Sequence, residues 1–362
     1  MRRNSHSTKQ IKTGLLISFV TIFVCMGMLE LIGYIWETNT AQGSLGWTLV
    51  GARRLKLEEN GSAEQPFYKL RPFENYNWEG IPVNINSLGF RNEEFSIQKS
   101  SDTYRILNLG DSIAFGWKVR VEDTYGKKLE RLLNESSDGT RYEVINAGVP
   151  TWNLESERNF LLQEGLKYQP DFVILDVTVV NDIYGTGPAI SENRSLFQWL
   201  RDHTYGWPFL TINMRFLLAK QIGPEAIPVL NPPKEAGWYY PLDENDETWN
   251  RIWEPIKEMY QATQAEDIDF VMIIFPTAYQ VNSAGHPNTP QRILIERAEQ
   301  VDMKHIDLLP LYKMVCKEAK PAECEGYENL LFADVWMHPN VLGNQLASEK
   351  LFEKLWPINK VR

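Results

Sequence analysis

The feature that most constrains this chain is a long apolar run near its N-terminus, residues 13–36. Between Gly14 and Leu29 no side chain is charged, and Glu30 is the only acid in the run. A helix needs about 20 apolar residues to cross a hydrocarbon layer of ~30 Å, so one membrane-spanning helix is predicted. Four cations precede the run and none follows it before Arg53, which places the N-terminus in the cytoplasm. The four are Arg2, Arg3, Lys9 and Lys12.

This run divides the chain into a cytoplasmic tail at residues 1–12, a signal anchor at residues 13–36, and an extracytoplasmic remainder, periplasmic or at the cell surface. A cleavable signal peptide is the alternative, because it shares the basic start and the apolar run. The run is longer than the usual apolar region of such peptides, about 7–15 residues. The best cleavage position, after Ala41, also lacks a small residue at Asn39.

Charge and cysteine content exclude several functions. The chain has 37 Lys and Arg against 47 Asp and Glu, and it has no basic block that could follow a phosphate backbone, so nucleic-acid binding is not expected. Three cysteines without metal-ligand spacing do not indicate a zinc site. Outside the cytoplasm Cys316 and Cys324 are expected either to form a disulfide or to remain two independent thiols.

Beyond residue 101, short apolar runs alternate with helix-like stretches. The runs are continuous rather than alternating in polarity, as strands buried on both faces require. Strands and helices in this order predict a parallel sheet between two layers of helices, a three-layer α/β/α fold. Strands are expected at residues 104–109, 142–146, 172–180, 269–275 and 306–309, and helices at residues 124–134, 154–168, 247–265, 290–301 and 340–355.

The remaining segments complete the predicted domain organisation. Residues 37–100 show weak periodicity and are expected to form a stem and lead-in to a catalytic domain at residues 101–358. The strand and helix pattern stops at residues 183–247, an insertion with several aromatic side chains. This insertion follows a strand end on the side where α/β domains bind ligands, so it is expected either to act as a lid or to form a small helical subdomain packed by its aromatic side chains.

A sharp turn at the end of the first predicted strand presents a serine, in the order Gly110, Asp111, Ser112. A turn at the carboxyl edge of a parallel strand lets a hydroxyl group and backbone N–H groups face one cleft, as nucleophilic catalysis requires. The same three residues are also ordinary turn and helix-capping chemistry. The serine is therefore a candidate nucleophile only in combination with a base elsewhere.

Three further elements stand where a serine hydrolase needs them. The second strand ends in NAG at Gly148, the third ends in VND with Asn181, and DVWMHPN, with Asp334 and His338, precedes the last helix. With the Gly-Asp-Ser turn, these blocks resemble the SGNH, or GDSL, hydrolase superfamily, in order across residues 106–350. The stretch NSLGFR at residues 86–91 is similar to the lead-in of membrane-anchored bacterial members associated with surface polysaccharides.

The resemblance implies a role for each of these residues. Ser112 would be the nucleophile, and His338 the base that takes its proton. The oxyanion hole would be formed by Ser112 N–H, Gly148 N–H and the side-chain amide of Asn181. Asp334 is expected to orient the imidazole. No metal ion or organic cofactor is required.

Two positions depart from the family pattern. Val179 stands where the family's GxND block has glycine. The carboxylate expected three residues before the histidine is replaced by Val335, and Asp334 lies four residues before it. A one-residue backbone adjustment would aim Asp334 at the imidazole, and a Ser-His dyad is the alternative. His286, also followed by Pro-Asn, is a rival base.

The sequence thus predicts an extracytoplasmic serine esterase that cleaves small acyl esters through an acyl-serine. The resemblance implies an acetyl group on a carbohydrate as the substrate, and the apolar run at residues 13–36 predicts attachment to the membrane. The resemblance specifies no protein partner. An O-acetyltransferase that uses the same serine is one alternative. An inactive binding module on the same fold, favoured by the two departures, is another.

Overall fold

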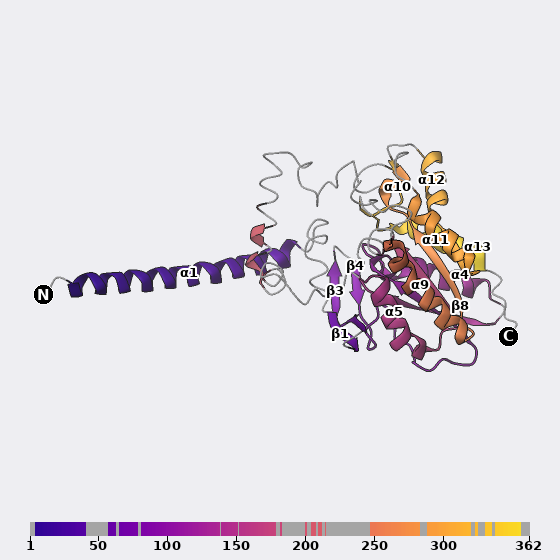
Figure 1. Cartoon of the computed structure of the whole chain (residues 1–362), viewed down its shortest axis with the longest axis horizontal. Coiled ribbons are helices and arrows are strands. Elements are labelled where there is room, and N and C mark those ends of the chain that lie inside the picture. The colour runs from indigo at the N-terminus through magenta and orange to yellow at the C-terminus, as the bar shows by residue number, and fades with distance from the viewer. Residues whose placement is uncertain are drawn as a thin grey trace. The chain divides into compact units, whose positions relative to one another are not determined.

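The computed structural model divides the chain into two compact units, Met1–Arg54 with Ile190–Ala236 and Leu55–Ala189 with Gly237–Arg362. Figure 1 shows the chain coloured from end to end. The residues described are 4–40, 57–62, 65–78, 81–137, 139–150, 152–178, 182, 200, 204–207, 209–211, 214, 247–282, 288–319, 323–324, 330–334 and 337–355.

The predicted apolar helix is present as α1 (Asn4–Thr40) in the first unit. Its stretch Leu16–Ile35 has a mean hydropathy of 2.2, and only 6% of its most apolar window is buried. Within the described part of the chain it is the one helix long and apolar enough to cross a membrane. A signal anchor and a signal peptide both have this form.

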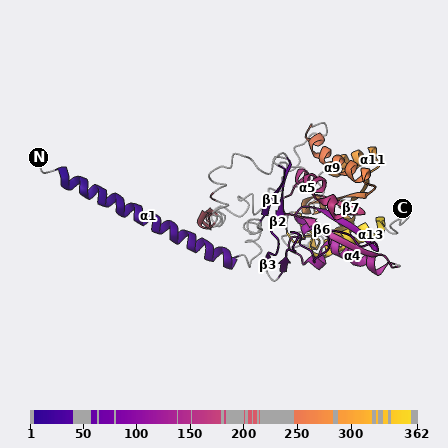
Figure 2. The same cartoon turned by 90° about the horizontal axis from the view of Figure 1, so that it is seen from below.

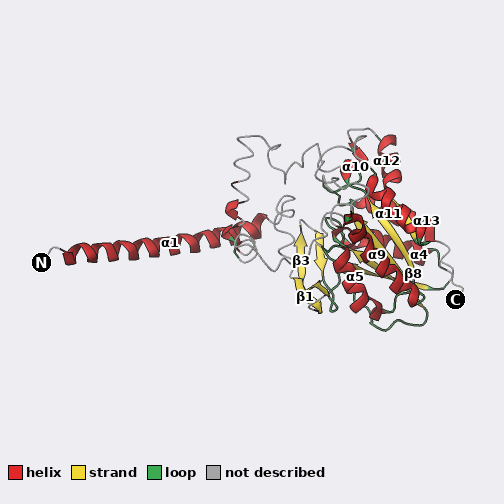
Figure 3. Ribbon diagram, viewed as in Figure 1, coloured by secondary structure: helices red, strands yellow, loops and turns green. Residues whose placement is uncertain are grey.

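The second unit contains a five-stranded, all-parallel sheet with the order β6-β5-β7-β8-β9. Figure 3 shows the strands of this unit in yellow among red helices. The chain order reverses between β5 and β7, because β6 pairs on one side of β5 and all later strands lie on the other. In open α/β sheets such a switch point is where ligands bind. The strands are β5 (Thr103–Gly110), β6 (Arg141–Gly148), β7 (Phe172–Thr178), β8 (Asp269–Phe275) and β9 (Lys304–Asp307).

Helices cover both faces of this sheet, which confirms the predicted three-layer fold. Neighbouring side chains of a strand point to opposite faces. Along β5, Ile106 joins the apolar cluster of α4, α12 and α13, whereas Leu107 lies near α5 and Gly165. The helices are α4 (Tyr125–Glu135), α5 (Leu154–Gln163), α9 (Thr248–Ala265), α10 (Ala278–Asn282), α11 (Thr289–Gln300), α12 (Leu309–Glu318) and α13 (Val341–Leu355).

Most predicted boundaries agree with the structure to within two residues; the strand expected at residues 306–309 lies two residues earlier, and the helix expected at residues 154–168 ends five residues early. The expected strand at residues 306–309 gives way to helix α12, because the Asp307 side chain accepts a hydrogen bond from Leu309 N at 2.9 Å and Pro310 suits a first helical turn. The expected helix at residues 154–168 ends early and continues as the 3₁₀-helix η2 (Gly165–Tyr168).

The lead-in is more ordered than its weak periodicity suggested. It contains two antiparallel ribbons, β1 (Leu57–Ser62) with β2 (Gln65–Leu70) and β3 (Asn75–Trp78) with β4 (Ile81–Asn84). The β1–β2 ribbon packs on helix α5 (Figure 2). From Leu55 onward the lead-in is thus part of the same compact unit as the sheet. Most of the insertion at residues 183–247 lies outside the described residues.

Cys316, in helix α12, forms a disulfide with Cys324, eight positions later in the chain. We expect the double substitution Cys316→Ser with Cys324→Ser to lower the free energy of unfolding by about 2–3 kcal/mol. A disulfide between residues this close in sequence restricts the unfolded chain by about this much, and the substitution removes the restriction. Urea unfolding of the two proteins measures the difference. Alkylation without prior reduction should modify Cys25 but neither Cys316 nor Cys324, and alkylation after reduction should modify all three. Alkylation of Cys316 and Cys324 in the unreduced protein would contradict the bond.

Candidate active site

The candidate nucleophile lies at the switch point of the sheet, directly after β5. Ser112 is the first residue of the short helix α3 (Ser112–Phe115), and Asp111 caps this helix by accepting a hydrogen bond from Ile113 N at 2.8 Å. Gly116 ends the helix with φ of 83°, a left-handed conformation that favours glycine. The sequence GDSIAFG therefore encodes a strand, a tight turn and one helical turn that presents Ser112.

Two glycines let this turn sit deep against the sheet. A Cβ atom on Gly148, at the end of β6, would lie 2.1 Å from Phe115 N and 2.5 Å from the carbonyl carbon of Ala114. A Cβ atom on Gly110 would lie 2.2 Å from the carboxylate of Asp176. Both positions thus exclude any larger residue, because the backbone of α3 and a buried carboxylate occupy the space.

The candidate base lies on a closed loop before α13. Ala333 N donates to His338 O at 2.8 Å, and Phe332 pairs with Pro339 as an isolated β-bridge. Within this loop Asp334 Oδ1 accepts hydrogen bonds from Met337 N at 3.1 Å and from His338 N at 3.3 Å. The carboxylate thus folds back over the loop, so that the four-residue spacing still directs it to the imidazole.

The structure brings Ser112, His338 and Asp334 together. Ser112 Oγ lies 2.9 Å from His338 Nε2, although 226 positions separate the two residues in sequence. His338 Nδ1 lies 2.5 Å from Asp334 Oδ2. The side chains of His338 and Asp334 are 13% and 7% exposed. A hydroxyl, an imidazole and a carboxylate in this order can transfer the serine proton to the imidazole and stabilise the imidazolium that results.

The three oxyanion donors that the resemblance implies differ in whether the structure describes them and in whether their N–H group is already hydrogen-bonded. Ser112 N–H lies at the N-terminus of α3, where helical N–H groups have no acceptor in the helix itself. Gly148 N–H donates to the side chain of Asn146 at 3.1 Å, so it is already paired in this state. Asn181 lies outside the described residues, as does Val179.

The other histidines do not join this group in the described structure. His305 lies in β9, and its Nδ1 is 3.2 Å from Met303 O. His286, the rival base, and His203 lie outside the described residues, and so does Val335.

A set of buried carboxylates lies beneath the turn that presents Ser112, and no motif in the sequence predicted it. Asp176 of β7, Asp182 and Glu157 of α5 are each 0% exposed. Burial is the main cause that raises the pKa of each of the three well above its ordinary value, and the negative charge of Asp111 adds to this effect. Tyr125 Oη donates to Asp176 Oδ2 at 2.9 Å. The acid within the apolar run FVILDVT was the only sign of this set in the sequence.

We expect Asp176→Asn to flatten the pH dependence of stability. Because burial raises the pKa of Asp176, the folded state keeps a proton that the unfolded state releases above about pH 4. The stability that this proton provides is complete below the unfolded pKa and is lost as pH rises towards the folded pKa, by about 1.4 kcal/mol per pH unit. Urea unfolding at pH 5 and pH 8 measures the slope, with Asp102→Asn as the surface control. An unchanged slope in Asp176→Asn would contradict the buried neutral acid.

A parallel α/β domain with a Ser, His and Asp chain at its switch point is an arrangement typical of serine hydrolases. The chain belongs to the GDSL-like Lipase/Acylhydrolase family, whose model matches residues 109–346.

Solved structures of two esterases are similar to this chain at low identity. The acetylxylan esterase Axe2 from Geobacillus stearothermophilus shares 13% identity with a TM-score of 0.43, and the match covers 70% of this chain and 94% of that one. The acetyl xylan esterase AlAXEase shares 15% identity with a TM-score of 0.45, with coverages of 69% and 98%. A comparison with curated proteins finds no match.

Proposed function

We propose that this protein is an extracytoplasmic serine esterase that removes small acyl groups, acetyl above all, from carbohydrate through an acyl-serine intermediate. The observation that carries the proposal is the chain of contacts from Ser112 Oγ through both nitrogens of His338 to Asp334. Membership of an acylhydrolase family supports the same class of reaction.

In the first half of the proposed reaction, Ser112 Oγ attacks the ester carbonyl carbon while His338 Nε2 takes the hydroxyl proton. Asp334 holds the Nδ1–H of the imidazole and stabilises its positive charge. The tetrahedral intermediate then collapses, the bond to the alcohol oxygen breaks, and His338 gives its proton to the leaving alcohol. The acyl group remains on Ser112.

In the second half, a water oxygen attacks the acyl carbon while His338 Nε2 takes a proton from the water. The bond between this carbon and Ser112 Oγ then breaks, His338 returns the proton to Oγ, and the acid and free serine result. The developing oxyanion needs positioned N–H donors, each of which is typically worth about 10²–10³-fold in rate. Ser112 N–H is the donor best supported by its place at the start of α3. Gly148 N–H can serve once the Asn146 side chain releases it, and the Asn181 amide is proposed as the third donor.

The proposed cellular setting follows from the apolar helix and the lead-in. We propose that residues 13–36 anchor the protein, with residues 1–12 in the cytoplasm and the catalytic domain, residues 101–358, outside it, connected by residues 37–100. A tethered domain outside the cytoplasm meets envelope polysaccharides. The resemblance of residues 86–91 to members associated with such polysaccharides supports carbohydrate as the alcohol portion of the substrate.

The test is turnover of p-nitrophenyl acetate and of an acetylated oligosaccharide by the full chain in detergent, with and without an unacetylated oligosaccharide as acceptor. An esterase releases free acetate at the same yield in both conditions. Acetylated acceptor as the main product would instead establish an acetyltransferase. Absence of any turnover that depends on Ser112 would favour the inactive binding module and overturn the proposal.

A further inference from the structure

The lead-in motif at residues 86–91 forms a compact turn that points an arginine into the protein. Asn86 organises the turn, since its Oδ1 accepts hydrogen bonds from Leu88 N at 3.0 Å and Phe90 N at 2.9 Å. Gly89 has φ of 83°, which favours glycine, and a Cβ atom there would lie 2.7 Å from Leu70 O. The next residue, Arg91, is 1% exposed.

The guanidinium of Arg91 binds the loop that follows the nucleophile helix. Nη1 donates to Phe115 O at 3.1 Å and to Gly116 O at 2.7 Å, and Nη2 donates to Val119 O at 2.8 Å. A fourth bond, from Nη2 to Pro82 O at 3.2 Å, ties it to β4. Three carbonyl groups of loop 115–119 thus depend on one side chain from the lead-in.

Loop 115–119 also contacts His338 and the residue before Asp334. The indole ring of Trp117 stacks on the imidazole of His338, with ring centroids 5.7 Å apart and an angle of 25° between the planes. Lys118 Nζ donates to Ala333 O at 3.2 Å, next to Asp334. Lys118 has φ of 62°, a conformation that residues with side chains rarely adopt, so the surrounding contacts must hold it there.

We infer that Arg91 is a positioning residue for the catalytic histidine, acting through loop 115–119. By fixing the loop carbonyls, Arg91 holds the Trp117 ring against one face of the imidazole and Lys118 against the residue before Asp334. The imidazole then stays in line between Ser112 Oγ and Asp334. This inference rests on the proposed function, because it assigns His338 as the base.

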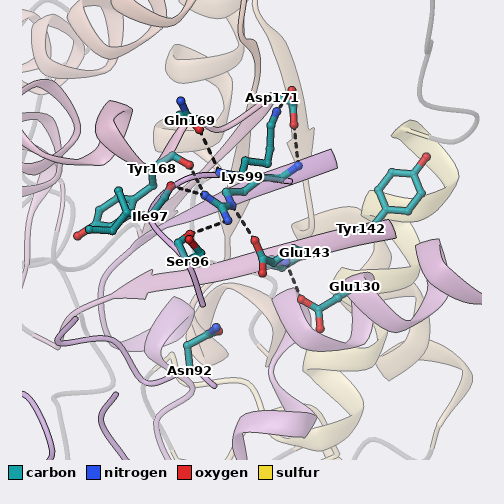
Figure 4. A network of polar contacts seen from close by, with 12 residues as sticks. Asn92, Ser96, Ile97, Lys99, Glu130, Tyr142, Glu143, Tyr168, Gln169 and Asp171 are labelled. Carbon is teal, nitrogen blue, oxygen red and sulfur yellow. Dashed lines mark hydrogen bonds and ion pairs between the residues drawn. The ribbon is translucent and has the colours of Figure 1, made fainter. Parts of the chain in front are cut away.

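Arg105 provides a matched comparison within the same unit. It is also buried, at 2% exposed, and it also donates to backbone carbonyl groups, those of Ser96, Ile97 and Tyr168, while its Nε pairs with Glu143; Figure 4 labels these four partners. It lies near the start of β5, roughly 15–20 Å along the strand from the serine turn at about 3.3 Å per residue. Loss of Arg105 therefore weakens the fold without touching loop 115–119.

The test compares Arg91→Met with Arg105→Met in the full chain, below the melting temperature of both. We expect Arg91→Met to lower kcat for p-nitrophenyl acetate by about 10- to 100-fold with little change in KM, since small displacements of a reacting group have effects of this size. Arg105→Met should keep the wild-type kcat. Trp117→Leu should lower kcat like Arg91→Met, Trp117→Phe should restore most of it, and the double variant of Arg91→Met and Trp117→Leu should fall little further than either alone.

A second readout separates this inference from the proposed function. The low-field proton resonance of His338 Nδ1–H, identified by its loss in Asp334→Ala, should shift or broaden in Arg91→Met and remain in Arg105→Met, whether or not the protein turns over an ester. If Arg91→Met does not fold, Arg91→Lys gives the decision, because one ammonium group cannot serve three carbonyls. A wild-type kcat and resonance in a folded Arg91 variant, or equal losses in Arg105→Met, would overturn the inference.

Discussion

Replacing Ser112 by alanine is expected to lower kcat for p-nitrophenyl acetate by about 10⁵–10⁶-fold, the size found when a triad nucleophile is removed. In the proposed reaction the hydroxyl oxygen is the atom that forms the acyl intermediate, and alanine has no nucleophilic atom at this position. The residual rate then comes from the oxyanion donors and from substrate binding alone. Steady-state kinetics on purified wild-type and variant protein measures the change.

Ser348→Ala is the matched control for this experiment. Ser348 is also buried, at 1% exposed, but it lies in α13 and its hydroxyl donates to Gln345 O at 2.7 Å. This variant should keep kcat within a few-fold of the wild type. A Ser112→Ala protein that retains a tenth or more of the wild-type kcat would show that the nucleophile lies elsewhere.

The second large effect is expected for Asp334→Asn, with kcat lower by about 10⁴-fold. Met337 N and His338 N both donate to Asp334 Oδ1, so the oxygen of the new amide must stay at this position. Its NH₂ group then faces His338 Nδ1 as a donor. The imidazole must carry its proton on Nε2 instead, and it can no longer accept the proton of Ser112.

Asp307→Asn gives the control, because Asp307 also accepts a backbone N–H, that of Leu309, away from the imidazole. It should retain wild-type kcat. A loss of less than about 10-fold in Asp334→Asn would contradict the orienting role of this carboxylate and would favour a dyad of Ser112 and His338, with a backbone carbonyl holding the imidazole.

The parallel sheet could be predicted from the sequence because each central strand is a continuous apolar run, as burial on both faces demands. The strand at residues 269–275 matches β8 (Asp269–Phe275) for this reason. The antiparallel ribbons of the lead-in could not be predicted, since strands such as Leu57–Ser62, with the sequence LEENGS, have no apolar face to reveal them.

The order of the motifs predicted that His338 approaches Ser112. The four-residue spacing between Asp334 and the histidine left two alternatives open, an orienting carboxylate or a dyad of serine and histidine alone. Whether a carboxylate four residues before the histidine reaches Nδ1 depends on the path of the loop, which backbone hydrogen bonds at Ala333 and Met337 determine. The contacts of Arg91 were equally inaccessible, because they join residues from the lead-in to backbone carbonyls, which carry no sequence signature.

The central claim is that His338 makes Ser112 nucleophilic, and covalent labelling with a fluorophosphonate probe tests it most directly. We expect the wild type to be modified on the peptide containing Ser112, Ser112→Ala to remain unmodified, and His338→Ala to react several orders of magnitude more slowly. Labelling of the wild type on a different residue, or labelling of His338→Ala at the wild-type rate, would show that this pair does not provide the nucleophile.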